Sequence, residues 1–138
     1  MEYQWSPSWV LSFHLLAMLL VVSGCSDAVD GRVHLRGTVT LDGAPLSDGT
    51  LTLTPIEKGP SSGAAIHNGE FKIAAAKGPA AGKYRVSIES FVEVPNDSPE
   101  FDGPSTKQIL PAKYNIDSEL QIETKEAGEN EFSFDLSS

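Results

Sequence analysis

The chain has 138 residues, with 19 Asp and Glu against 10 Lys and Arg, which gives a net charge of −9. This length fits one domain, and the acidic balance argues against nucleic acid as a partner because phosphate backbones repel it. The single cysteine rules out an internal disulfide and a thiolate metal site. The apolar fraction of 40% is ordinary for a folded domain and argues against a wholly disordered chain.

An apolar run over residues 9–22, WVLSFHLLAMLLVV, is polar at only two positions and carries no charge. It matches the apolar region of a signal peptide and falls short of the roughly 20 residues that a membrane-spanning helix needs. Small residues follow it, as they do before a signal-peptidase cleavage point. The sequence therefore predicts a helical signal peptide over residues 1–24, with cleavage between Gly24 and Cys25.

The residues Val22-Ser23-Gly24-Cys25 resemble a bacterial lipobox. The resemblance implies that Cys25 receives a diacylglycerol thioether and becomes the new N-terminus, which makes it unavailable as a nucleophile or metal ligand. Two or three acyl chains would hold the protein durably at a membrane, since each buried CH₂ contributes about 0.8 kcal/mol and a single acyl chain gives only marginal binding. The leader departs from the usual basic start, because it carries Glu2 and no Lys or Arg. An uncleaved membrane anchor and a buried core helix remain alternatives.

After a small polar tether, which with Cys25 covers residues 25–32, apolar residues alternate with polar ones in short segments, and no apolar stripe of helical period is sustained. In the segment 83–94 the inward-facing residues are Tyr84, Val86 and Ile88. In the segment 130–136, Phe132, Phe134 and Leu136 share one face. Asp42-Gly43 and Asn68-Gly69 are strong turn signals. The pattern predicts an all-β domain over residues 33–138, an antiparallel seven-stranded β-sandwich. The predicted strands are 33–41, 50–56, 83–94, 119–125 and 130–136, with a hairpin over 64–73.

Three segments resemble a carboxypeptidase regulatory-like domain: GTVTLDGAPLSDGTLTLTP at 37–55, HNGEFKI at 67–73 and AAGKYRVSI at 80–88. The C-terminal part from LPAKYN at 110–115 is similar to short lipoproteins of planctomycete-type bacteria. The resemblance covers about residues 33–136. It implies a prealbumin-like (transthyretin-like) or Ig-like sandwich, a class of accessory module without catalytic activity.

No catalytic or cofactor set stands out in the sequence. His34 falls on the outward face of its strand and His67 abuts a turn, so both are expected at the surface. The prealbumin-like fold also hosts a hydrolase that ends in Tyr-Arg-Gly-Ser, whereas this chain ends in FDLSS at 134–138. Nucleotide-binding glycine motifs are lacking. We therefore expect neither enzymatic activity nor a cofactor.

The polar segment 95–108, PNDSPEFDGPSTKQ, is expected to form a long loop. Its acidic residues could bind Ca²⁺, although the spacing of a calcium-binding loop is lacking. The aromatic residues Phe101 and Tyr114 could be exposed and dock a sugar or a partner, unless they pin the loop onto the domain. The candidate ligand contacts are thus Asp97, Phe101, Asp102 and Tyr114, and no metal site is predicted.

These observations predict an exported, non-enzymatic lipoprotein of the cell envelope. Its lipid on Cys25 would anchor it to the cell membrane or the outer membrane, facing the periplasm or the exterior. The domain would act as a structural or binding module for an envelope protein or a polysaccharide. The alternative is a module that binds a small ligand, a glycan or calcium through the 95–108 loop.

Overall fold

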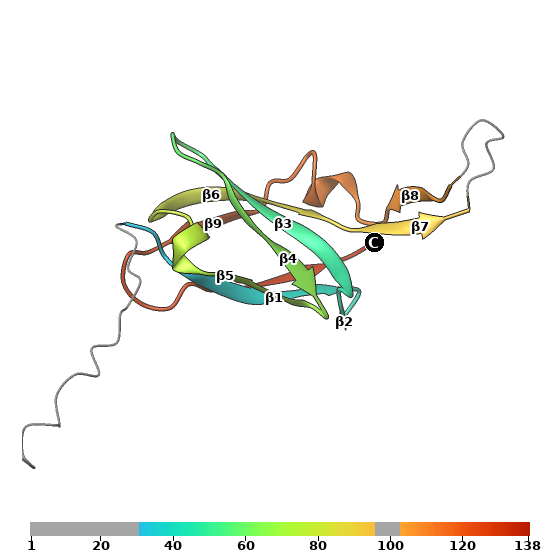
Figure 1. Ribbon diagram of the computed structural model, residues 1–138, viewed down its shortest axis with the longest axis horizontal. Coiled ribbons are helices and arrows are strands. Elements are labelled where there is room, and N and C mark those ends of the chain that lie inside the picture. Colours follow the sequence, from blue (N-terminus) through green and yellow to red (C-terminus); the bar gives the residue numbers. More distant parts are fainter. Residues whose placement is uncertain (1–30, 96–102) are drawn as a thin grey trace, which may run out of the picture.

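The computed structural model describes residues 31–95 and 103–138, and this part of the chain is built mainly from β-strands (Figure 1). The predicted signal peptide over residues 1–24 lies outside the described residues. In chain order the elements are β1 (Leu35–Leu41), β2 (Ala44–Pro45), β3 (Asp48–Pro55), β4 (Ser62–His67), β5 (Glu70–Ile73), the 3₁₀ turn η1 (Ala75–Lys77), β6 (Gly82–Glu89), β7 (Phe91–Val94), β8 (Ser105–Gln108), the 3₁₀ turn η2 (Ala112–Tyr114), β9 (Gln121–Thr124) and β10 (Glu131–Leu136).

Most of the strands belong to one curled sheet. They follow one another in the order β10-β1-β5-β4-β3-β6-β9, and β2 pairs with β1 beside this path. Neighbours are antiparallel, except that β1 and β10 run parallel with Gly37 opposite Phe132. The curl places β6 and β9 across the interior from β1 and β5, with β3 and β4 joining the two sides (Figure 1). Strands β7 and β8 form a separate two-stranded sheet.

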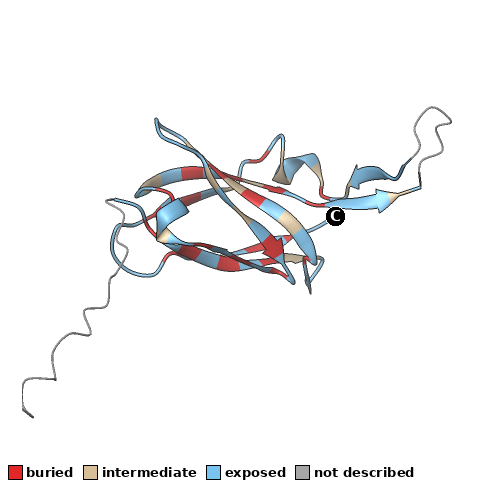
Figure 2. Ribbon diagram, viewed as in Figure 1, coloured by how far each residue is buried: buried red, intermediate tan, exposed pale blue. Residues whose placement is uncertain are grey.

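Buried residues alternate with exposed ones along the strands, as the colours in Figure 2 show, and the buried residues form one core. Leu51 and Leu53 on β3 and Val86 on β6 are fully buried. Burial of one such side chain contributes about 1.5–3 kcal/mol, so this shared core holds the sheet in its curled form. The inward faces predicted for 83–94 and 130–136 are confirmed: the buried members are Tyr84, Val86, Ile88, Phe134 and Leu136, and Phe132 is partly buried.

Both predicted turn dipeptides form tight connections. The φ angles of Asp42 and Gly43 are 53° and 83°, and those of Asn68 and Gly69 are 51° and 78°. Two consecutive positive φ angles are what a type I′ hairpin turn requires. The predicted hairpin over 64–73 is therefore confirmed as β4 and β5, whereas the first turn connects β1 to the short strand β2.

Three expectations need correction. The predicted strand 83–94 is divided at Ser90 into β6 and β7, because β6 lies on the body of the domain and β7 extends beyond it. The predicted loop 95–108 is wrong over Ser105–Gln108, which forms β8; its side chains are polar because the two-stranded sheet has no interior to cover them. A wholly antiparallel sheet is also wrong, because β10 joins the edge beside β1 through a loop that crosses from β9.

The seven predicted strands thus correspond to β1, β3, β4, β5, the pair β6 and β7, β9, and β10, and the described residues add β2 and β8.

The parallel pair is secured by two residues. Buried Asn130 ends the loop from β9, where its side chain accepts a hydrogen bond from Lys125 N at 2.9 Å and donates one to Lys125 O at 3.0 Å. Gly37 lets β10 approach β1, because a Cβ at this position would overlap the carbonyl oxygen of Phe132 and lie 2.6 Å from the ring of Phe71. The edge of the sheet therefore depends on a residue without a side chain.

Candidate functional site

The predicted site residues are only partly described by the structure. Tyr114 is described, at the end of η2. The residues outside the described ranges are Gly24, Cys25, Asp97, Phe101 and Asp102. Their roles in lipidation, cleavage and ligand contact therefore stay predictions.

Tyr114 forms a cluster with the C-terminal residues. Its half-buried ring packs against the core, and its hydroxyl accepts a hydrogen bond from the Ser137 backbone N–H at 3.0 Å. The same hydroxyl lies 3.2 Å from Ser137 Oγ, and Lys113 Nζ donates to that Oγ at 3.2 Å. The Lys113 ammonium also lies 4.9 Å from the centre of the Tyr114 ring. The cluster joins η2 to the residues that follow β10.

Serine, lysine and tyrosine can together form a nucleophilic site, but the surroundings of this cluster favour a structural role. A lysine becomes a general base when burial penalises its charge, and Lys113 is exposed, as is Ser137. The hydrogen bond with the Ser137 side chain lowers the pKa of Tyr114, and the Ser137 amide and Lys113 act in the same direction. We therefore interpret the Tyr114 hydroxyl as an anchor for the C-terminus.

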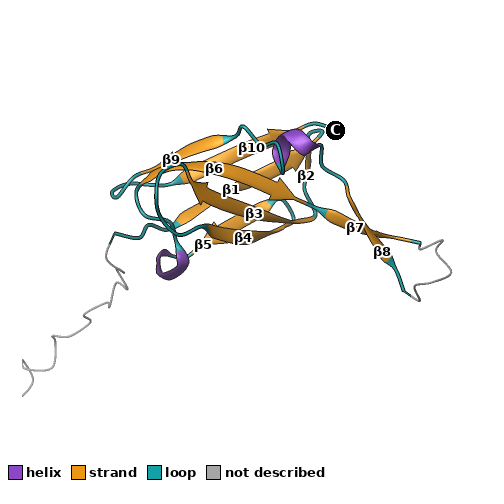
Figure 3. Ribbon diagram, turned by 90° about the horizontal axis from the view of Figure 1, so that it is seen from above, coloured by secondary structure: helices purple, strands orange, loops and turns teal. Residues whose placement is uncertain are grey.

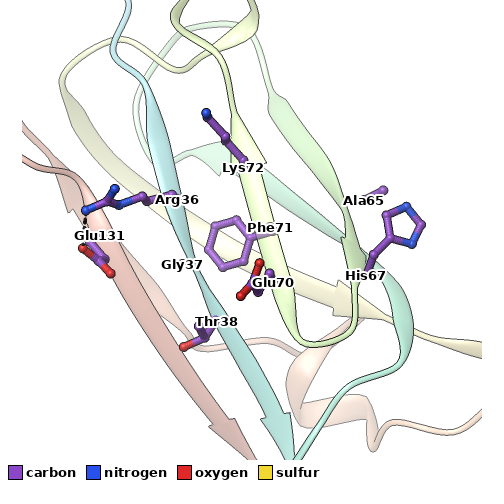
Figure 4. Close-up of a pocket in the computed structure, with 9 residues that line it drawn as sticks. All are labelled: Arg36, Gly37, Thr38, Ala65, His67, Glu70, Phe71, Lys72 and Glu131. Atoms are coloured by element: carbon purple, nitrogen blue, oxygen red, sulfur yellow. Dashed lines mark hydrogen bonds and ion pairs between the residues drawn. The ribbon is translucent and has the colours of Figure 1, made fainter.

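A broad polar hollow of about 600 Å³ covers the outer surface of β1, β4, β5 and β10 (Figure 4). Its charged side chains carry both signs, with Arg36 and Lys72 beside Glu70 and Glu131. Arg36 donates to Glu131 at 3.0 Å and lies 3.6 Å from Glu129, and these carboxylates raise its pKa. Among the side chains that line the hollow, Arg36 and Glu131 pair with each other.

The same surface continues as a ladder of polar pairs between the parallel strands. Thr38 Oγ1 lies 3.0 Å from Ser133 Oγ, and Thr40 Oγ1 donates to Asp135 Oδ1 at 2.6 Å. Side chains that face one another across neighbouring strands stabilise the pairing. This face therefore supports the edge of the sheet.

The two histidines predicted at the surface are both exposed. His67 Nδ1 lies 3.0 Å from Asp48 Oδ1, a pair that joins the end of β4 to the start of β3. In residues 31–95 and 103–138, no group of three or more His, Cys, Asp or Glu could hold a metal ion. Within the same ranges, no helix has the length and apolar character needed to cross a membrane.

The feature that sequence reasoning missed is a projecting arm. Strands β7 and β8 extend beyond the curled sheet as a hairpin, and the two views agree on this (Figures 1 and 3). Every side chain of these strands is exposed or half-buried. The arm is fixed at its base by Gln108, whose Oε1 accepts hydrogen bonds from Ser90 N at 3.0 Å and Leu110 N at 3.2 Å.

An apolar groove of about 270 Å³ lies at the base of the arm. Among the described residues, five large apolar side chains are exposed, and three of them line this groove: Phe91 at 55%, Val92 at 41% and Ile109 at 36%. The groove is also lined by the end of β1 and by the segment from β2 to the start of β3, which contribute Leu41, Ala44, Pro45, Leu46, Ser47 and Asp48. Apolar side chains gathered at one exposed place are typical of an interaction site.

One signal in the sequence could have identified this site. Phe91 is an odd-numbered residue, whereas the inward-facing residues of the same segment, Tyr84, Val86 and Ile88, are even-numbered. In a strand that continues without interruption, Phe91 must therefore face outward.

In a comparison with known proteins, no family model, no curated protein and no solved structure matches this chain.

Proposed function

We propose that the chain is an exported lipoprotein without catalytic activity, whose β-sandwich domain of the carboxypeptidase regulatory-like kind is held at a membrane surface by lipid on Cys25. In this proposal the domain is a binding module for an envelope protein. It resides at the cell membrane or the outer membrane and faces the periplasm or the exterior.

The observation that carries the proposal is the position of the arm relative to the N-terminal end of the domain. Val33 N donates to Pro79 O at 2.9 Å and Arg32 pairs with Ala80, so the chain joins the body beside the start of β6. The arm leaves from the other end of β6, which is 8 residues long. At about 3.3 Å per residue, the two ends are about 26 Å apart.

This arrangement suits a domain that is tethered at one end and binds at the other. Five residues separate Cys25 from Gly31, so the six steps between these two residues can span at most about 22 Å. Lipid on Cys25 would therefore keep the start of β6 near the bilayer and direct the arm away from it. The net charge of −9 provides no attraction to anionic headgroups, so attachment would depend on the lipid.

The anchor is tested by expressing the full chain in a bacterium that processes lipoproteins. We expect membrane-bound protein whose mature mass begins at a diacylglyceryl Cys25. The Cys25→Ala variant should lose the lipid and keep residues 1–24, whereas the neighbouring control Ser26→Ala should be processed normally. A wild-type mature mass that still contains residues 1–24 would refute the proposal.

The orientation is tested with a fluorophore on a single introduced thiol, since Cys25 is the only cysteine of the chain. Thr106→Cys places the label on the arm, and Glu126→Cys places it just after β9, whose Thr124 pairs with Gly82 at the start of β6. A quencher attached to lipid headgroups should quench the label at 126 more strongly than the label at 106. Equal quenching would contradict the proposed orientation.

A further inference from the structure

We propose that the free edge of β7 binds an extended segment of a partner protein in which apolar and basic residues alternate. The segment would add a strand to β7 and place apolar side chains in the groove at the base of the arm. This inference rests on the proposed function for its biological setting, but the binding site itself does not involve the lipid.

The direction of the backbone groups shows which of them lie on this edge of β7. Along a strand, the N–H and C=O groups of successive residues point to alternate sides. Val86 N donates to Leu120 O at 2.8 Å, and Ser90 O accepts from Ile109 N at 2.9 Å, both on the side of β6 and β7 away from β3. The groups of Phe91 and Glu93 must therefore point toward the side of β3.

No strand of the described residues occupies that side of β7. Strand β3 accompanies β6 only as far as the pair of Thr50 with Glu89, and it begins at Asp48. The Asp48 carbonyl accepts a hydrogen bond from Ser90 Oγ at 2.6 Å, which fixes the start of β3 at the point where β7 leaves the body. An added strand would thus continue the line of β3 beside β7, which is the pattern of strand addition to a sheet edge.

The groove supplies side-chain contacts for such a strand. Phe91 and Val92 border it on the arm, and Leu46 lies on the side of the body. Backbone hydrogen bonds provide affinity in strand addition, while pockets for alternate side chains provide specificity. A two-stranded hairpin is only marginally stable in water, so a third strand would also stabilise the arm.

The charges around this edge favour a basic occupant. Asp48 lines the groove, and Glu89 and Glu93 lie on either side of Phe91 along the chain. A charge on an exposed strand discourages pairing with unsuitable strands. A second copy of this chain would offer an edge with the same carboxylates, whereas lysine or arginine side chains would complement them.

The test is a selection from a displayed library of random ten-residue peptides on the full-length chain, carried out with lipidated protein in detergent and with the Cys25→Ala variant. Enriched peptides should alternate apolar and basic residues and bind both proteins equally. Failure of lipidation with unchanged peptide binding would refute the proposed function and leave this inference standing.

Three variants make the test specific. Phe91→Ser should weaken an enriched peptide at least tenfold, and Glu93→Lys should shift the selected peptides from basic to acidic residues. Glu70→Lys, the same charge change in the polar hollow, should leave the selection unchanged. N-methylation of alternate peptide amides should abolish binding in one register and spare it in the other.

Three results would overturn the inference. The first is a selection that enriches no peptide above background. The second is a set of enriched peptides that bind the Phe91→Ser and Glu93→Lys variants as well as the wild type. The third is a dimer in sedimentation velocity that Phe91→Ser dissociates, which would make a second copy the occupant.

Discussion

The arm can be loosened without changing the body of the domain by replacing Gln108. Its side-chain oxygen accepts hydrogen bonds from Ser90 N, just before β7, and from Leu110 N, just after β8, at the base of the hairpin. Gln108→Ala removes both bonds and leaves the core residues in place. We therefore expect the hairpin to open more often while the curled sheet keeps its stability.

The size of the effect follows from the two bonds. A hydrogen bond of this kind contributes about 1 kcal/mol net, so the free energy of opening the arm should fall by about 2 kcal/mol. Since every 1.4 kcal/mol corresponds to a factor of ten, amides of the arm should exchange about 30-fold faster. Gln108→Glu is the matched control, because a carboxylate oxygen accepts from the same two amides.

Hydrogen exchange followed by mass spectrometry measures this change. Peptides that cover β7 and the segment from β8 to Leu110 should exchange faster in Gln108→Ala, and peptides of β3 and β6 should not. Gln108→Glu should exchange like the wild type. Equal acceleration of arm and body would show that they open as one unit, and unchanged exchange in the arm would show that the Gln108 bonds do not hold it; either result refutes the reasoning.

Two further predictions concern the edge strand and the C-terminus. Gly37→Ala should lower the free energy of unfolding by about 1–3 kcal/mol or more, because the new methyl group overlaps Phe132 O and crowds the Phe71 ring. Urea denaturation measures this change, and an unchanged midpoint would contradict it. Because the pKa of Tyr114 is lowered by Ser137 in the folded state, its contribution to stability should be complete above the unfolded value of 10.0 and be lost as the pH falls through the lowered pKa. Ser137→Ala should move the NMR titration midpoint of Tyr114 upward, and an identical midpoint would exclude the hydrogen bond as the cause.

The elements of the body were predictable because each strand carries a local signal. Alternation identified Tyr84, Val86 and Ile88 as an inward face, and it did so because one side of that strand meets a core. Asn68-Gly69 identified a hairpin because few other dipeptides adopt two positive φ angles in succession. In both cases the residues that make the signal also make the contact.

The arm and the parallel pair could not be predicted in the same way. Strand β8, Ser105–Gln108, has no alternation because neither of its faces is covered. The division of this segment at Ser90 into β6 and β7 depends on where β3 begins, which is at Asp48. Asp48 lies far away in the sequence, so no residue pattern within 83–94 indicates the division. Parallel and antiparallel neighbours produce the same alternation on a half-buried strand, so the partner of β1 at the edge of the sheet was not evident.

The candidate site was missed for a related reason. Sequence reasoning selected Phe101 and Tyr114 as the aromatic residues that could be exposed, since both follow polar or irregular segments. Phe91 lies within a strong strand pattern, and its position in that pattern directs it outward. Its exposure of 55% follows from the phase of the strand together with the end of the body at Ser90.

The free edge of the arm and the apolar groove at its base have the same structural cause. A strand that runs past the end of its sheet has one side without a partner, and β8 satisfies only the other side of β7. The remaining backbone groups of Phe91 and Glu93 point to the side on which no strand of the described residues lies, and this leaves the hairpin with few stabilising contacts. A strand that added itself there would satisfy these groups, cover the apolar groove and neutralise the nearby carboxylates in the same step. Binding should therefore slow hydrogen exchange in the arm most strongly and in the body least.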